Sequence, residues 1–189
     1  MGGGGVFISS GTFSMEGNAS VLNNITNNPY RWENMRTRGG GVYLANGTFT
    51  MRDNASVSGN SNAGWGANSH GGGVLIANGT FTMQDRAWIS RNTVANGDGG
   101  GVHIAGGAFT MQGNAVISGN SASQGGGVCV ADGTFTKTGG TLAGNDVPAD
   151  QRNTASGLGS AIHAASNRYR NATAGVTINT ASPSFWAND

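Results

Sequence analysis

The sequence predicts an all-β protein, a right-handed parallel β-helix (β-solenoid) with about five full three-strand coils, degenerate C-terminal coils and a cap. The first observation is repetition, because the stretch VYLANGTFTMRDNASVSGN from Val42 recurs in register from Val6, Val74 and Val102, and one residue shorter from Val128. In the four intact copies the closing Asn follows the Val by 18 residues, whereas the Val-to-Val steps fall from 36 to 32, 28 and 26. A constant coil with a variable loop at one corner is typical of a solenoid.

The second observation is alternation of apolar residues within each copy, which predicts strands rather than helices. Each copy contains three short alternating runs, in the second copy Val42 and Leu44, Phe49 and Met51, Ala55 and Val57. Asn46-Gly47 and Arg52-Asp53-Asn54 separate these runs, and such residues form corners because they tolerate left-handed backbone. Stacked coils place identical strands side by side about 4.8 Å apart, and parallel crossovers are almost always right-handed.

The repeats align the expected core residues in columns that run along the solenoid. The columns are Phe13, Phe49, Phe81, Phe109 and Phe135; Met15, Met51, Met83 and Met111, then Lys137; and Ala19, Ala55, Ala87 and Ala115 beside Val21, Val57, Ile89 and Ile117. The corner before each variable loop carries Asn24, Asn60, Asn92, Asn120 and Asn145. We expect these five amides to point inward and to form a hydrogen-bonded ladder, which is a structural device.

Composition limits the classes of function. The chain has 189 residues, 10% of them charged, with a net charge of +1 and one cysteine. These values argue against a nucleic-acid partner and exclude an intrachain disulfide. No apolar run is long enough to span a membrane.

We assign residues 1–145 to the five coils and residues 146–189 to a degenerate coil and a C-terminal cap, in which Phe185-Trp186 covers the core. The chain begins within a repeat and has no signal peptide. We therefore expect a fragment of a longer protein, with an open N-terminal strand edge that continues into further coils or supports end-to-end self-association.

Several motifs resemble a known group of proteins. Gly71-Gly72-Gly73-Val74, Gly79-Thr80-Phe81-Thr82-Met83 and Ile117-Ser118-Gly119-Asn120 are similar to the GGGVYV, GTFTM and ISGN repeats of bacterial surface-associated β-helix proteins, and the segment from Arg168 to Val176 is similar to their closing segment. The resemblance covers nearly the whole chain. It implies a secreted or cell-surface location and says little about activity, because the shared motifs are structural.

Two surfaces are expected to bind a partner. The variable loops carry Tyr30, Arg31, Trp32 and Trp65, and Trp88 is expected to point outward from the third strand. Exposed aromatic residues and Arg are typical of recognition surfaces. The first strand is expected to expose a partly apolar file, which we interpret as a contact surface for a glycan or a host protein or as a self-stacked ladder: Phe7, Tyr43, Leu75, His103, Cys129 and His163.

The middle strand offers an alternative function. Its outward positions form two files, in which nine of ten residues are Ser or Thr: Thr12, Thr48, Thr80, Ala108 and Thr134, beside Ser14, Thr50, Thr82, Thr110 and Thr136. Such a flat grid resembles the water-ordering face of β-solenoid ice-binding proteins. Thr is also a common residue on any exposed strand.

A second alternative is a polysaccharide-active enzyme, since acid–base chemistry on sugars needs paired carboxylates. Asp53 and Asp85 occupy one corner of neighbouring coils, but Gly17 and Gly113 take the same position, which indicates a turn. Zinc would accept His103, Cys129 and His163, but the outer two rungs lie about 9.6 Å apart and no fourth ligand is evident. We therefore expect no metal, no cofactor and no catalysis, and a structural or adhesive role.

Overall fold

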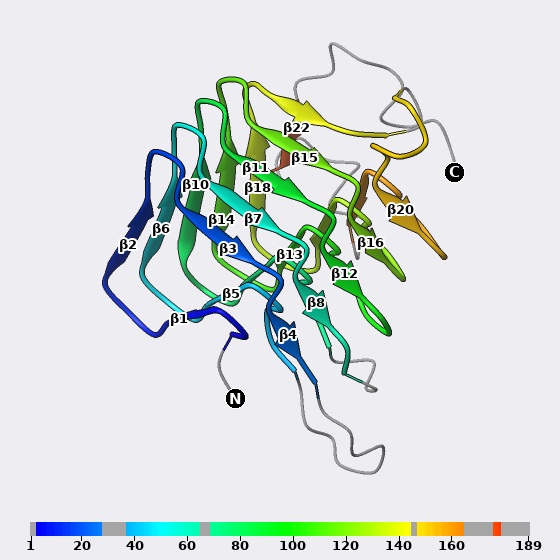
Figure 1. Cartoon of the computed structure of the whole chain (residues 1–189), viewed down its shortest axis with the longest axis horizontal. Coiled ribbons are helices and arrows are strands. Elements are labelled where there is room, and N and C mark those ends of the chain that lie inside the picture. The colour runs from blue at the N-terminus through cyan, green and yellow to red at the C-terminus, as the bar shows by residue number, and fades with distance from the viewer. Residues whose placement is uncertain (1–2, 28–36, 65–68, 145–146, 165–175, 179–189) are drawn as a thin grey trace.

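The computed structural model describes residues 3–27, 37–64, 69–144, 147–164 and 176–178. These residues confirm the predicted fold class, a parallel β-solenoid in which four sheets run along the stack (Figure 1). In the described part of the chain every regular element is a strand. Each sheet takes one strand from successive coils, so residues far apart in sequence pair in parallel register.

The first two sheets each contain six strands. The first sheet consists of β1 (Val6–Ile8), β5 (Val42–Leu44), β9 (Val74–Ile76), β13 (Val102–Ile104), β17 (Val128–Val130) and β21 (Ile162–Ala164). The second sheet consists of β2 (Thr12–Met15), β6 (Thr48–Met51), β10 (Thr80–Met83), β14 (Ala108–Met111), β18 (Thr134–Lys137) and β22 (Val176–Ile178).

The third and fourth sheets each contain five strands. The third sheet consists of β3 (Ser20–Leu22), β7 (Ser56–Ser58), β11 (Trp88–Ser90), β15 (Val116–Ser118) and β19 (Thr141–Leu142). The fourth sheet consists of β4 (Ile25–Thr26), β8 (Ser61–Asn62), β12 (Thr93–Val94), β16 (Ser121–Ala122) and β20 (Thr154–Ala155). This fourth sheet corrects the prediction of three strands per coil, and its strands are only two residues long.

The number of regular coils is also smaller than predicted. Four coils carry all four strands without interruption, from β1 to β4, β5 to β8, β9 to β12 and β13 to β16. The fifth is irregular, because β19 has two residues and a segment of several residues separates it from β20. The predicted Phe185-Trp186 cap lies outside the described residues.

The core columns pair as the repeat predicts. Phe49 stacks on Phe81 and Phe81 on Phe109, each with ring centroids 4.7 Å apart, and all three rings are fully buried. Offset stacking at this spacing matches the distance between parallel strands, so one residue type repeated in register fills the core. Lys137 ends the Met column, and partial burial lowers its pKa.

The predicted asparagine ladder is present, with one correction. The side-chain oxygen of Asn92 accepts hydrogen bonds from both the backbone N–H and the side-chain amide of Asn60, each at 2.9 Å. The same pair of bonds joins Asn24 to Asn60 and Asn92 to Asn120. The fifth rung is Asn153, which accepts from Asn120, whereas the predicted Asn145 lies outside the described residues.

Candidate functional site

The first-strand file lies largely inside the protein, so the prediction that it is exposed is wrong for four of its residues. Tyr43 and Leu75 are each 6% exposed, His103 is 2% exposed and Cys129 is 1% exposed. Phe7, in the first coil, is 53% exposed and stacks on Tyr43 with ring centroids 5.2 Å apart. His163, in the last coil, is half-buried, so the proposed first-strand contact surface is reduced to the two ends of the file, Phe7 and His163.

The chain returning from each variable loop covers this file. The Arg38 guanidinium lies 5.2 Å from the centre of the Tyr43 ring and donates a 2.7 Å hydrogen bond to its hydroxyl. His70 stacks on His103 with ring centroids 4.2 Å apart. A Cβ atom at Gly99 would lie 2.7 Å from the Cβ of His103, so only glycine allows this close approach.

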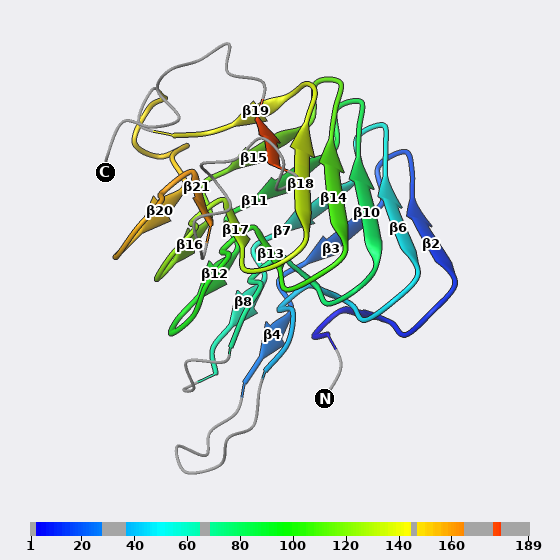
Figure 2. The same cartoon turned by 180° about the vertical axis from the view of Figure 1, so that it is seen from behind.

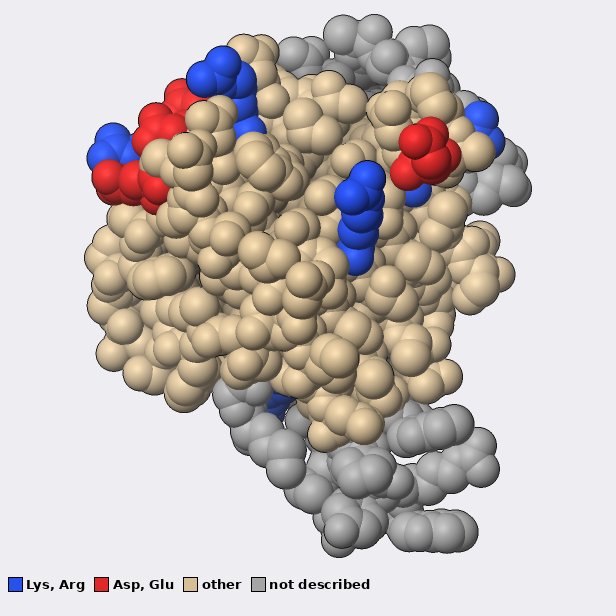
Figure 3. Space-filling view, in the orientation of Figure 1, with Lys and Arg blue, Asp and Glu red and all other residues tan. Residues whose placement is uncertain are grey.

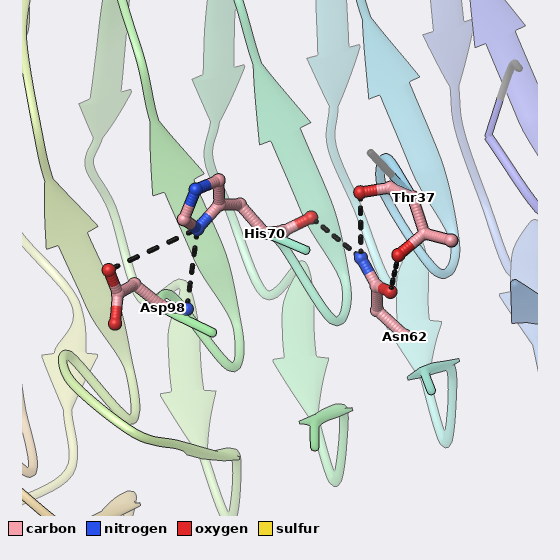
Figure 4. A network of polar contacts seen from close by, with 4 residues as sticks. All are labelled: Thr37, Asn62, His70 and Asp98. Carbon is pink, nitrogen blue, oxygen red and sulfur yellow. Dashed lines mark hydrogen bonds and ion pairs between the residues drawn. The ribbon is translucent and has the colours of Figure 1, made fainter. Parts of the chain in front are cut away.

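A polar network joins the returning chain to the fourth sheet (Figure 4). The Asn62 amide donates hydrogen bonds to the carbonyl oxygens of Thr37 and His70, at 3.2 and 3.0 Å. The Thr37 hydroxyl bonds to Asn62 and to Ser69, and all three of these side chains are buried. His70 Nδ1 accepts from the backbone N–H of Asp98 at 3.4 Å and lies 4.0 Å from its carboxylate. The network therefore holds Thr37, Ser69 and His70 against the fourth sheet.

The buried His and Cys side chains are poorly suited to chemistry. Burial lowers the pKa of His103 to about 3, and the neighbouring His70 adds to this effect. Burial likewise raises the pKa of Cys129 to about 12, which keeps the thiol protonated. Among the described residues, no three His, Cys, Asp or Glu side chains are grouped to hold a metal ion.

The candidate catalytic carboxylates bind the backbone instead of facing one another. Asp53 and Asp85 both have left-handed backbone, with φ of 57° and 56°, as do Gly17 and Gly113 in the equivalent corners. The Asp53 carboxylate accepts a 2.8 Å hydrogen bond from the N–H of Gly17, and the Asp85 carboxylate accepts one of 3.2 Å from the N–H of Asp53. The two groups thus act as corner residues of the stack.

The strands of the second sheet, from β2 to β18, lie side by side (Figure 2), and their outward positions match the predicted Ser/Thr grid. Parallel pairing in register places Thr48 beside Thr80, Thr50 beside Thr82 and Thr110 beside Thr136. Ala108 interrupts one file, between Thr80 and Thr134. All ten side chains point outward and none is fully buried: Thr12, Thr48, Thr80, Ala108, Thr134, Ser14, Thr50, Thr82, Thr110 and Thr136.

Sequence reasoning missed a second hydroxyl-bearing surface, on the outward face of the fourth sheet. Residues 93–95, 121–123 and 154–156 line an open groove of about 450 Å³. The groove contains five hydroxyl groups, those of Thr93, Ser121, Ser123, Thr154 and Ser156. The sequence signal was a Ser or Thr one residue after four of the five ladder Asn residues, a pattern that is also common in ordinary loops.

Trp88 lies on the outward side of the third sheet and is 38% exposed, as predicted. It pairs with Ser56, which is only 5% exposed, and with Val116. The predicted loop residues Tyr30, Arg31, Trp32 and Trp65 lie outside the described residues. Trp88 is therefore the only predicted binding residue besides Phe7 and His163 that the described structure places at the surface.

Comparisons with protein-family models, curated proteins and solved structures give no match. The described residues also include no apolar helix of membrane-spanning length.

Proposed function

We propose that this chain is a non-enzymatic, secreted or cell-surface β-solenoid with a structural and adhesive role. One observation carries the proposal: the carboxylates of Asp53 and Asp85 accept hydrogen bonds from the backbone at the corners of the coil, whereas hydroxyl groups and Trp88 occupy the outward faces. The resemblance of the repeats to bacterial surface-associated β-helix proteins supports the location. Self-association through the edge strands β1 to β4 stays a prediction.

The rigidity of the coil supports this role. The Phe column and the asparagine ladder join each coil to the next, and the polar network around Asn62 adds contacts between coils, so the outward residues keep fixed spacings along the stack. A rigid periodic surface can make many weak contacts with an extended partner at a low cost in conformational entropy. Such contacts suit a glycan or a protein of a cell surface or matrix.

The experiment is a binding screen of the purified chain on immobilised glycans and matrix proteins. We expect saturable binding to at least one component. Binding to none of them would contradict the adhesive role.

The Ser/Thr grid of the second sheet favours ice binding as a second candidate function. Pairing in register gives hydroxyl groups about 4.8 Å apart between strands and about 6.8 Å apart along them. If this face orders water, Thr82→Lys will abolish thermal hysteresis, whereas Ser121→Lys on the fourth sheet will leave it unchanged. Absence of thermal hysteresis in the unmodified chain would exclude this candidate.

A further inference from the structure

We propose that the groove on the outward face of β12, β16 and β20 binds a neutral glycan chain, an inference that rests on the proposed adhesive function and names its ligand and site. The groove is formed by the same three positions in three successive coils, 93–95, 121–123 and 154–156. Its volume of about 450 Å³ lies within the range of ordinary ligand sites.

The hydroxyl groups of the groove are available to a ligand. In the described part of the chain, the side chains of Thr93, Ser121, Ser123, Thr154 and Ser156 make no hydrogen bond within the protein. Their backbone N–H groups are already used, for example that of Ser121 with the carbonyl of Asn92. The backbone is therefore fixed, and each hydroxyl can both donate and accept a hydrogen bond.

The dimensions of the groove fit a sugar chain. Adjacent strands lie about 4.8 Å apart, close to the length of one pyranose residue, so three strands present a hydroxyl array to about two sugars. Ala95 places a methyl group among the hydroxyls, which suits the mixture of C–H and O–H groups on a pyranose.

The groove carries no charged side chain, which favours a neutral ligand over a charged one. None of the nine residues that line the groove is ionisable, so nothing there pairs with a phosphate, sulfate or carboxylate group. Figure 3 shows one face of the molecule, on which most of the surface is uncharged and the charged side chains lie mainly in the upper half. A protein partner would also need large apolar anchors, and the groove offers only methyl groups and Val94.

A second observation points to the same ligand. Trp88 lies five residues before Thr93 in the same coil, on the outward face of β11, and the residue is 38% exposed. The equivalent positions are Ser20, Ser56 and Val116. An exposed indole gives a sugar ring a flat apolar surface to stack on, so a longer glycan can extend from the groove toward Trp88.

The test measures the affinity of the whole chain for a panel of neutral oligosaccharides of glucose, mannose, galactose and N-acetylglucosamine. Ser121→Arg places a bulky cation in the groove, and Thr110→Arg is the matched control, because Thr110 is also a half-buried outward strand residue of the same coil. We expect Ser121→Arg to lower the affinity at least about thirtyfold and Trp88→Ala several-fold, with no change in Thr110→Arg.

A second, milder variant controls for the case in which Ser121→Arg fails to fold. Ser121→Ala combined with Ser123→Ala removes two hydroxyls without adding volume and is expected to weaken binding about tenfold. Unchanged affinity in this variant and in Ser121→Arg would overturn the proposal that the groove binds the glycan, but it would leave the adhesive function standing. Binding only to charged glycans or to proteins would have the same meaning. Binding to nothing on this panel or in the broader screen would overturn both.

Discussion

Replacing Asn92 with Ala is expected to lower the free energy of unfolding by about 4 kcal/mol. Asn92 is fully buried, and its amide donates to the carbonyl of Val57 at 3.0 Å and to the side-chain oxygen of Asn120 at 2.9 Å. Its oxygen also accepts both bonds from Asn60. The substitution removes all four of these hydrogen bonds, each worth about 1 kcal/mol, and leaves the buried backbone N–H of Asn60 without its acceptor. Urea unfolding followed by circular dichroism measures the change.

The first rung of the ladder supplies the control. Asn24 donates to Asn60 but is only partly buried, so Asn24→Ala is expected to cost only about 1 kcal/mol. An equal decrease in the free energy of unfolding in the two variants would contradict this prediction, because it would show that the contribution of a ladder residue does not depend on its burial.

Lowering the pH from 7 to 4.5 is expected to remove about 3 kcal/mol of stability through His103 alone. The folded-state pKa is about 3, whereas an unfolded His titrates near 6.5, so the unfolded chain binds a proton that the folded chain excludes. The stability is therefore complete above about pH 6.5 and is lost progressively as the pH falls toward 3. The groups next to His103 are the ring of His70, the backbone of Asp98, and Leu75 and Cys129 on the two neighbouring strands.

His103→Leu tests this contribution, because Leu75 fills the same position in the preceding coil. We expect the variant to lose about 3 kcal/mol less than the unmodified chain between pH 7 and pH 4.5, measured by urea unfolding at both values. Equal losses in the two proteins would contradict a buried neutral imidazole.

The sequence predicted the core because its columns depend on a period that every coil repeats. Phe49, Phe81 and Phe109 recur at one position, and parallel pairing in register is the arrangement that buries all of them. The corner role of Asp53 followed in the same way from Gly17 in the equivalent position, since both need left-handed backbone.

The burial of the first-strand file could not be read from alternation, because alternation separates two sides of a strand without saying what covers each side. The covering segment is the chain returning from the loop, whose length varies between coils. Its signal was the glycine run before each first strand. Gly99 and Gly125 have φ of 72° and 60°, and a Cβ at either would lie 2.7 Å from the Cβ of His103 or Cys129.

The hydroxyl groove was missed for a different reason. Its strands are two residues long, for example β12 and β16, so no alternation can be detected within them. The predicted position of the last ladder residue, Asn145, came from counting along the repeat. The structure instead places Asn153 beside Asn120, beyond an insertion that a fixed period cannot follow.

A non-enzymatic adhesin binds its partner without altering it, and the most direct measurement of this property is the mass of the glycans recovered after prolonged incubation with the protein. We predict that a bound glycan is recovered with an unchanged mass. A glycan shortened by the unmodified chain, but left intact by a variant carrying Asp53→Asn and Asp85→Asn, would contradict the account and identify an enzyme.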